Sequence, residues 1–264
     1  MEDSSTVYFT GTAGAGKTHL VAAFATWLKS AGYDPIVVNL DPGNESTALE
    51  PDVDIREWVR LPEVMDEYQL GPNGGQVAAA DMIALKIFEI RQAVAELKAD
   101  YVLVDTPGQV ELFAFRESSK AIVDALSGDR STIAFLFDPA LAKSPAGFVS
   151  LLMLSATVEF RFRLPTLNLL TKVDLLKPEQ LEEIGAWGDD PSRLADAVSM
   201  EAPTPDVQLM TEMLRALGSL APMTALLPTS SVDRTGLEAV YQAAQQNIGA
   251  SDDLEPSQAP PESE

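Results

Sequence analysis

The sequence contains no cysteine and a single histidine. The lack of thiols excludes disulfides, thiolate metal sites and cysteine nucleophiles. One imidazole does not make a zinc site by itself, so we interpret His19 first as a helix residue without a chemical role. A zinc-dependent function is therefore not expected.

Long apolar runs are also absent. No run approaches the roughly 18 residues of a membrane helix, and the amino-terminal segment lacks the basic-then-apolar layout of a secretory signal. The 264 residues are 46% hydrophobic and 22% charged, which is enough for the core of one large α/β domain. We therefore expect a globular protein of the cytoplasm.

Basic residues are scarce, with 18 Lys and Arg against 40 Asp and Glu, a formal net charge of −22. Such a surface repels nucleic acids and anionic membranes, so direct binding to either is not expected. The acidity fits either a face for a basic partner or a cytoplasm at molar salt, where the Debye length is only about 3 Å. The even spread of the acidic residues and the few lysines favour the halophilic explanation.

Short β-rich runs alternate with helical stretches along the chain. The expected strands are residues 6–10, 35–40, 101–104, 133–137, 166–170 and, more weakly, 224–227. The expected helices are residues 19–30, 77–98, 116–126, 146–162, 207–217 and 237–247. This alternation predicts an α/β fold, a three-layer αβα sandwich with a mainly parallel sheet.

Three segments depart from the alternation. An insertion of about residues 52–80 contains several prolines and the sequence Gly-Pro-Asn-Gly-Gly. Residues 185–204 are rich in Asp, Pro and Ser, which we interpret as a surface excursion. Residues 250–264 have almost no apolar content and are expected to form a disordered acidic tail. We thus expect a single domain over residues 1–249.

The segment Gly11-Thr12-Ala13-Gly14-Ala15-Gly16-Lys17-Thr18 matches G-x-x-x-x-G-K-[ST] in full. In such a loop the backbone N–H groups face phosphate oxygens, the lysine reaches the β and γ phosphates, and the threonine ligates Mg²⁺. A glycine-rich turn without a ligand is the alternative, but a strand precedes the loop and a helix follows it. The nucleotide-binding residues predicted here are Gly11, Ala13, Gly14, Ala15, Gly16, Lys17, Thr18 and the adjoining His19.

A second motif, Asp105-Thr106-Pro107-Gly108-Gln109, directly follows the expected strand 101–104. An aspartate at the carboxyl end of a strand can hold magnesium directly or through water. The N–H of Gly108 can contact a γ-phosphate, which makes the segment a switch that relaxes on hydrolysis. The D-x-x-G pattern alone is common in turns; its place after a core strand supports the phosphate loop.

A third motif, Thr171-Lys172-Val173-Asp174, indicates which base is bound. Its aspartate can accept hydrogen bonds from the N1 and N2 donors of guanine, a pair that adenine lacks. Lys172 would lay its stem along the base. The alternative is that Asp174 simply caps a helix. Ser230 and Ser231 follow the next expected strand, and their backbone N–H groups are expected to contact the guanine oxygen.

Taken together, the motifs resemble those of the GPN-loop GTPases over about residues 5–248, as in an archaeal-type member from a halophile. The resemblance is carried by residues 11–18, Asn39-Leu40-Asp41-Pro42-Gly43, Gly71-Pro72-Asn73, Asp105-Thr106-Pro107-Gly108-Gln109-Val110-Glu111 and Thr171-Lys172-Val173-Asp174. Gly43 stands where the family usually has alanine, and Thr171 where many members have Ser or Asn.

The resemblance implies a homodimer that binds GTP with Mg²⁺ and hydrolyses it. Asn73 would reach across the dimer to the partner's γ-phosphate and attacking water. Asp41 would hold magnesium waters beside Thr18 and Asp105, and Asp41, Gln109 and Glu111 would be catalytic residues around the attacking water. Alternatively, Glu111 is a solvated surface residue without a catalytic role.

Two further groups have ambiguous roles. Arg56 and Arg60, in the insertion, are candidates for arginine fingers in trans, although such arginines more often pair with surface carboxylates. An apolar helix stripe is either core or a groove for a partner peptide, with core favoured; its members are Phe148, Leu151, Leu152, Leu154 and Phe160.

The function expected from these motifs is a GTP-hydrolysing homodimeric switch. By analogy with eukaryotic relatives it would serve assembly of a larger complex such as RNA polymerase, with a protein client. One alternative is an assembly factor in which nucleotide binding matters more than turnover. Another is an ATPase or phosphotransferase; related dimeric ATPases carry an extra lysine where Thr12 and Ala13 stand here.

Overall fold

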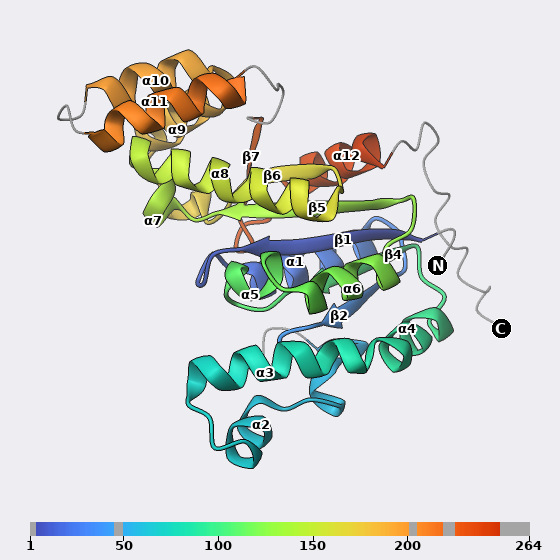
Figure 1. Ribbon diagram of the computed structural model, residues 1–264. Coiled ribbons are helices and arrows are strands. Elements are labelled where there is room, and N and C mark those ends of the chain that lie inside the picture. Colours follow the sequence, from blue (N-terminus) through green and yellow to red (C-terminus); the bar gives the residue numbers. More distant parts are fainter. Residues whose placement is uncertain (1–3, 45–49, 201–204, 219–224, 249–264) are drawn as a thin grey trace, which may run out of the picture.

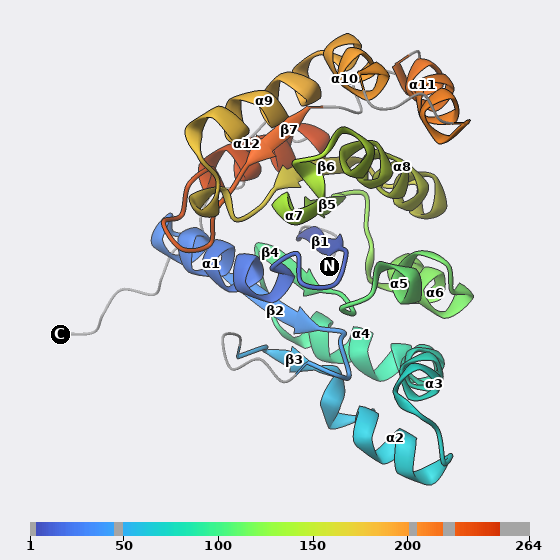
Figure 2. The same ribbon diagram turned by 90° about the vertical axis from the view of Figure 1, so that its left-hand side faces the viewer.

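The computed structural model describes residues 4–44, 50–200, 205–218 and 225–248. In this part of the chain, a seven-stranded sheet has the order β3-β2-β4-β1-β5-β6-β7, and every paired strand is parallel to its neighbour. Helices lie on both sides of the sheet (Figures 1 and 2). The predicted α/β sandwich is confirmed, with a wholly parallel sheet in the described residues.

The strands follow the apolar runs of the sequence. They are β1 Ser5–Gly11, β2 Pro35–Asn39, β3 Val53–Asp54, β4 Tyr101–Asp105, β5 Ser131–Phe137, β6 Thr166–Leu170 and β7 Leu226–Pro228. Central strands such as β1 and β5 are buried along their whole length, as expected for a sheet covered on both faces. Strand β3 was not predicted, because its two residues pair with β2 and carry no periodic pattern.

The two faces of the sheet carry separate cores. On one face, α1 (Lys17–Ser30) and α12 (Leu237–Asn247) cover side chains such as Val7 and Phe9. On the other, alternate side chains such as Tyr8 face a larger core. The helices on that side include α3 Pro72–Leu85, α4 Ile87–Glu96, α5 Val110–Ala114, α6 Glu117–Leu126 and α8 Pro145–Phe162.

The helix predicted over residues 77–98 is two helices, α3 and α4, which separate at Lys86. The first begins earlier than predicted, because Pro72 occupies its first turn, where a missing N–H costs nothing. The Gly-Pro-Asn sequence is therefore the start of α3. The rest of the insertion holds η1 (Ile55–Glu57) and α2 (Leu61–Glu67).

The surface excursion predicted for residues 185–204 is wrong over its described part. These residues belong to α9 (Pro178–Asp189) and α10 (Pro191–Ser199), and α11 (Pro205–Gly218) follows. Asp190 caps α10 by accepting the N–H of Ser192, so this Asp-Pro-Ser sequence begins a helix. Trp187, Leu194 and Val198 are buried in the core.

The apolar stripe of α8 is mostly core, as favoured by the sequence. Phe148, Leu151 and Leu152 are buried, and Leu154 packs against them from a half-buried position. Phe160 was wrongly placed in the core, since 64% of its surface is exposed. None of the helices in the described ranges combines the length and apolarity needed to cross a membrane. The predicted acidic tail, residues 250–264, lies outside the described residues.

Because all the strands run in one direction, the loops at their carboxyl ends meet along one edge of the sheet. The glycine-rich loop follows β1, the Asp41 loop follows β2, and the Gly108 segment follows β4. The Thr171–Asp174 motif, which includes η2 (Val173–Leu175), follows β6. The topology thus gathers at one edge the motifs that the sequence scatters over most of the chain.

Candidate nucleotide site

The glycine-rich loop closely approaches the sheet and then turns into α1. A Cβ on Gly11 would lie 2.9 Å from the carbonyl oxygen of Leu136, so only glycine fits there. Gly16 has φ 92°, a left-handed conformation, at the residue immediately before α1. The first N–H groups of a helix have no partner within the helix, so an anion is favoured at this end of α1.

Lys17 lies inside this curve and is only 6% exposed. Its Nζ donates to the carbonyl oxygens of Gly11 and Thr12 at 3.0 Å each and of Gly108 at 2.9 Å. Burial lowers the pKa of the amine, while the nearby carboxylates of Asp105 and Asp41 oppose this change. The ammonium group is therefore already placed where the phosphates of a nucleotide would need a positive charge.

Asp105, at the end of β4, is the buried acid of the site, with 1% of its surface exposed. Its Oδ2 accepts the hydroxyl of Thr18 at 2.7 Å, while its Oδ1 has no hydrogen-bond partner among the described residues. Burial raises the pKa of this carboxyl to about 7. A buried carboxylate oxygen without a partner is what a bound cation would satisfy.

The oxygen donors of Thr18 and Asp105 fit Mg²⁺, which prefers oxygen and takes one or two carboxylates plus phosphate and water. Within the described ranges, no group of three or more histidine or acidic side chains is placed to hold a metal. A magnesium ion here would therefore depend on the oxygens of a bound nucleotide.

Asp41 connects the loop after β2 with the segment after β4. Its Oδ1 accepts the N–H of Gly43 and its Oδ2 that of Gly108, both at 2.9 Å. Burial raises the pKa of Asp41, and these two N–H groups and Lys17 oppose the increase. The Gly108 N–H that the sequence assigns to a γ-phosphate is thus bonded to Asp41 in this structure.

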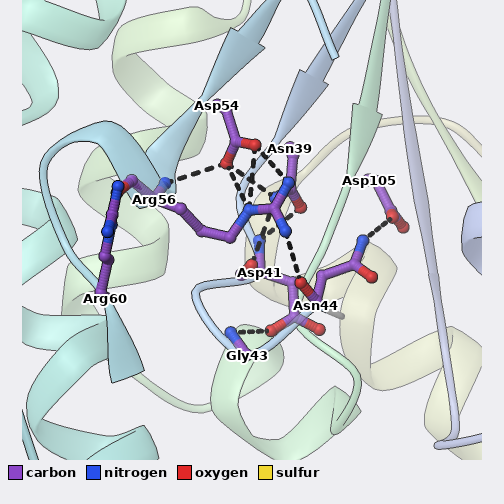
Figure 3. Close-up of polar contacts among 8 residues, drawn as sticks. All are labelled: Asn39, Asp41, Gly43, Asn44, Asp54, Arg56, Arg60 and Asp105. Atoms are coloured by element: carbon purple, nitrogen blue, oxygen red, sulfur yellow. Dashed lines mark hydrogen bonds and ion pairs between the residues drawn. The ribbon is translucent and has the colours of Figure 1, made fainter. Parts of the chain in front are cut away.

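A polar cluster that the sequence analysis missed lies behind Asp41 (Figure 3). Asn39, fully buried at the end of β2, accepts the N–H of Asp41 at 3.0 Å and donates to Asp54 Oδ1 at 3.0 Å. Asp54 in turn holds Arg56. The arginine predicted as a possible finger thus pairs with a carboxylate of its own chain, as does Arg60 with Glu63 at 3.7 Å.

The guanine motif contacts the glycine-rich loop. The Thr171 hydroxyl is buried and donates to the carbonyl oxygen of Ala15 at 2.9 Å, with that of Phe137 at 3.2 Å as a second acceptor. Threonine in place of Ser or Asn therefore does make a side-chain contact to the loop. Lys172, with φ 53°, reaches the carbonyl oxygen of Gly14 and pairs with Asp138 Oδ2 at 2.9 Å.

Asp174 is exposed at the start of η2, which has no side-chain cap, so its carboxylate is not used as the helix cap considered above. The hydroxyl of Ser230 donates to its Oδ1 at 2.7 Å. The N–H of Ser230 donates to the carbonyl oxygen of Thr235 at 3.1 Å in this structure, and its expected contact with a base stays a prediction. Ser231 is half-buried beside it, and the expected contact of its N–H with the guanine oxygen also stays a prediction.

A cavity of 190 Å³ adjoins the glycine-rich loop, and its lining includes Ala13, Asp41, Gly108 and Gln109. Gln76 of α3 also lines it; its Oε1 is buried and has no partner in the described part of the chain. Gln76 was missed because it follows the Gly-Pro-Asn motif without belonging to a recognised pattern.

The remaining predicted residues lie outside this cavity. Asn73, Glu111 and His19 are all exposed, on α3, α5 and α1. Asn73 is the second residue of α3, one helical turn before Gln76, and it is not among the described residues that line the cavity of its own chain.

The fold and these motifs were compared with known proteins. A family profile described as "Conserved hypothetical ATP binding protein" matches residues 9–250. The GPN-loop GTPase PAB0955 of Pyrococcus abyssi is 31% identical over 94% of this chain and 99% of its own length. This chain belongs to the GPN-loop GTPase family.

Further comparisons agree with this membership. GPN-loop GTPase 3 of Dictyostelium discoideum is 30% identical over 96% of this chain and 90% of its own length. The crystal structure of PAB0955, a GTPase in apo form, superposes with a TM-score of 0.85 at 30% identity, covering 95% of this chain and all of that one. The predicted family, fold and enzyme class, a GTPase on a P-loop scaffold, are confirmed.

Proposed function

We propose that this GPN-loop GTPase binds GTP with Mg²⁺, hydrolyses it to GDP and phosphate, and acts as a homodimeric switch. The observation that carries the proposal concerns the backbone of Gly108. Asp41 accepts its N–H and Lys17 donates to its carbonyl oxygen, each at 2.9 Å. Segments that follow three different strands thus meet at one residue, Gly108, beside the phosphate loop.

The backbone of Gly108 would supply the two states of a switch. A γ-phosphate would take the N–H of Gly108 from Asp41 and one or more of the Lys17 N–H groups from the backbone carbonyls. Loss of the γ-phosphate would let both bonds re-form. The equilibrium between the two arrangements is then set by whether the third phosphate is present.

For hydrolysis, the bound Mg²⁺ would neutralise charge on the phosphates, and Thr18 and Asp105 would hold it. Lys17 and the loop N–H groups stabilise the charge that develops on the transferred phosphoryl group. Gln109 lines the same cavity as Ala13, which supports a role for its side chain in orienting the attacking water. Glu111 is exposed on α5 and stays a weaker candidate for this work.

A homodimer would explain where Asn73 acts. Its exposed position outside its own cavity supports a contribution to the site of a second subunit. Leu85 and Phe88, 80% and 81% exposed where α3 meets α4, add apolar surface for a partner at the other end of α3. Asn73 would then donate its amide N–H to the partner's γ-phosphate region.

Mixing two inactive variants tests the action in trans. Lys17→Ala lacks phosphate binding and Asn73→Ala lacks the trans amide, so each homodimer should be nearly inactive. A mixed dimer would contain one complete site, and mixing should restore GTP turnover well above the sum of the two variants. Turnover that stays at that sum after subunit exchange would exclude the trans arrangement.

Guanine selection rests on Asp174, whose carboxylate Ser230 holds at 2.7 Å. The family profile is described as ATP binding, whereas the relatives are described as GTPases. Competition of a labelled GDP by unlabelled GDP and ATP, in KCl with Mg²⁺, distinguishes the two. We expect GDP to compete at concentrations where ATP does not; equal competition would favour the ATPase alternative.

We infer a cytoplasmic protein adapted to high salt, and an assembly role for a larger complex such as RNA polymerase with a protein client. A titration of folding in KCl tests the first point, since full stability in dilute buffer would contradict it. Client binding should differ between the GTP and GDP forms in a pull-down.

A further inference from the structure

Arg56 is the most extensively bonded arginine near the phosphate site, and all of these bonds lie within its own chain. Its Nε donates to both carboxylate oxygens of Asp54 at 2.9 Å, and its second terminal nitrogen also contacts Asp54. Its first terminal nitrogen donates to the carbonyl oxygen of Asn44 at 2.7 Å. The guanidinium therefore faces inward and joins β3 to the loop after β2 (Figure 3).

The same carboxylate also holds the other end of that loop. Asp54 Oδ1 accepts the side-chain N–H of Asn39 at 3.0 Å, and Asn39 Oδ1 accepts the backbone N–H of Asp41 at 3.0 Å. Residues 41–44 are thus fixed at Asp41 through Asp54 and Asn39, and at Asn44 by Arg56 itself. The Asp54–Arg56 ion pair is thus connected to both ends of this loop.

The loop held in this way faces the predicted magnesium site. Asp41 accepts the N–H of Gly108 at 2.9 Å, and the side-chain amide of Asn44 lies 3.4 Å from Asp105 Oδ2. We propose that Arg56 is a positioning residue in cis, which holds residues 41–44 so that Asp41 stays in place beside the metal and the γ-phosphate. The proposal rests on the Mg²⁺-dependent GTPase function given above.

The guanidinium is suited to this task in a way that lysine is not. Its planar group binds one carboxylate with two nitrogens and still has a donor for Asn44, whereas an ammonium is a point charge on a flexible stem. Arg56 also borders an open cleft of 1130 Å³ between the 42–44 loop and α2. If the side chain at position 56 is shortened, water from this cleft fills the space and no closed cavity forms. We therefore expect the substitution to act on the position of residues 41–44.

The test compares Arg56→Gln and Arg56→Lys with the matched control Arg60→Gln. Arg60 lies four residues away, lines the same cleft and is bonded only to the Arg56 carbonyl and Glu63 in the described contacts. GDP affinity is measured with Mg²⁺ and with EDTA, which gives the gain in affinity due to the metal. Backbone hydrogen exchange over residues 39–44 is measured in the nucleotide-free protein.

We expect Arg56→Gln to reduce the metal-dependent gain at least tenfold while GDP affinity in EDTA changes less than twofold. Exchange over residues 39–44 should become at least tenfold faster. Arg56→Lys should resemble Arg56→Gln, and Arg60→Gln should match the wild type within twofold. Asp54→Asn combined with Arg56→Gln should be little worse than either alone, because the two residues act as a unit.

An unchanged metal-dependent gain in Arg56→Gln would overturn the proposal. The proposal would also be overturned if Arg56→Gln lost GTP turnover while its metal-dependent gain in GDP affinity and its hydrogen exchange over residues 39–44 stayed as in the wild type. That result is expected of an arginine finger in trans. If the wild type bound no guanine nucleotide, the proposed function would fail. The exchange comparison would still decide whether Arg56 holds the loop, since it needs no nucleotide.

Discussion

The two ends of the proposed nucleotide site differ in how many of their contacts are present before a nucleotide binds. At the phosphate end, Lys17 and Asp105 are 6% and 1% exposed and bonded to the loops around them. At the base end, Asp174 is exposed and is held by the hydroxyl of Ser230. Most of the binding free energy should therefore come from the phosphates, and the choice of base from one carboxylate.

The largest effect is expected from Lys17→Ala. The variant removes the charge that lies inside the phosphate loop, so nucleotide affinity should fall by about 3 kcal/mol or more and turnover should become undetectable. Titration with a fluorescent GDP measures the first and phosphate release the second. Lys29→Ala, at the exposed end of the same helix, is the matched control and should behave as the wild type.

Asn73→Ala should come next, and it should act on turnover alone. Removing one donor to the transition state commonly costs on the order of 10²–10³ in kcat. Because Asn73 is exposed and lies outside the cavity of its own chain, GDP affinity should stay within twofold of the wild type. Gln92→Ala, exposed on α4, is the control; an equal loss of turnover there would point to a general disturbance.

At the base end, Asp174→Asn should weaken GDP binding by about 2–4 kcal/mol, because a charge-assisted pair with guanine is lost. ATP binding, already weak, should not change. Ser230→Ala should cost less, about 1 kcal/mol, since it removes only the hydroxyl that orients the carboxylate. Calorimetry with both nucleotides measures these differences, and an unchanged GDP affinity in Asp174→Asn would remove this residue from the site.

A separate effect concerns the stability of the protein without nucleotide or metal. The folded-state pKa of Asp105 is raised from 3.8 to about 7. The folded protein then holds this proton more tightly than the unfolded chain, so the contribution of Asp105 to stability falls as pH rises from about 4 to about 7. Within this window, the free energy of unfolding should fall by at most about 1.4 kcal/mol for each increase of one in pH.

Asp105→Asn isolates this effect from the other carboxylates. We expect the variant to gain stability relative to the wild type as pH rises through this window, measured by denaturant unfolding in EDTA. A difference between the two proteins that is independent of pH between about 4 and about 7 would show that burial of Asp105 carries no such cost.

The phosphate-binding end of the proposed site could be predicted from the sequence, because its residues belong to short local motifs. Thr18 and Asp105 belong to segments recognisable by spacing, and a parallel sheet must bring the ends of its strands together. In the structure the hydroxyl of Thr18 lies 2.7 Å from Asp105 Oδ2. Their roles in binding stay predictions until a ligand is measured.

What the sequence could not supply are contacts between segments without a motif of their own. Strand β3 has two residues, and the pairing of Asp54 with Arg56 depends on its position beside β2. The Asp-Pro-Ser composition around Asp190 was misinterpreted because the same residues begin helices and form loops. The hydroxyl of Ser230 donates a hydrogen bond to Asp174, which lies 56 residues earlier in the sequence, and no local pattern indicates this contact.

Release of inorganic phosphate from GTP and from ATP is the most direct measurement of the account. It should be made with the wild type and Lys17→Ala, in concentrated KCl with Mg²⁺. We predict steady release from GTP by the wild type, little from ATP, and none above background by Lys17→Ala. Equal release from the two nucleotides, or turnover of GTP that survives the loss of Lys17, would contradict it.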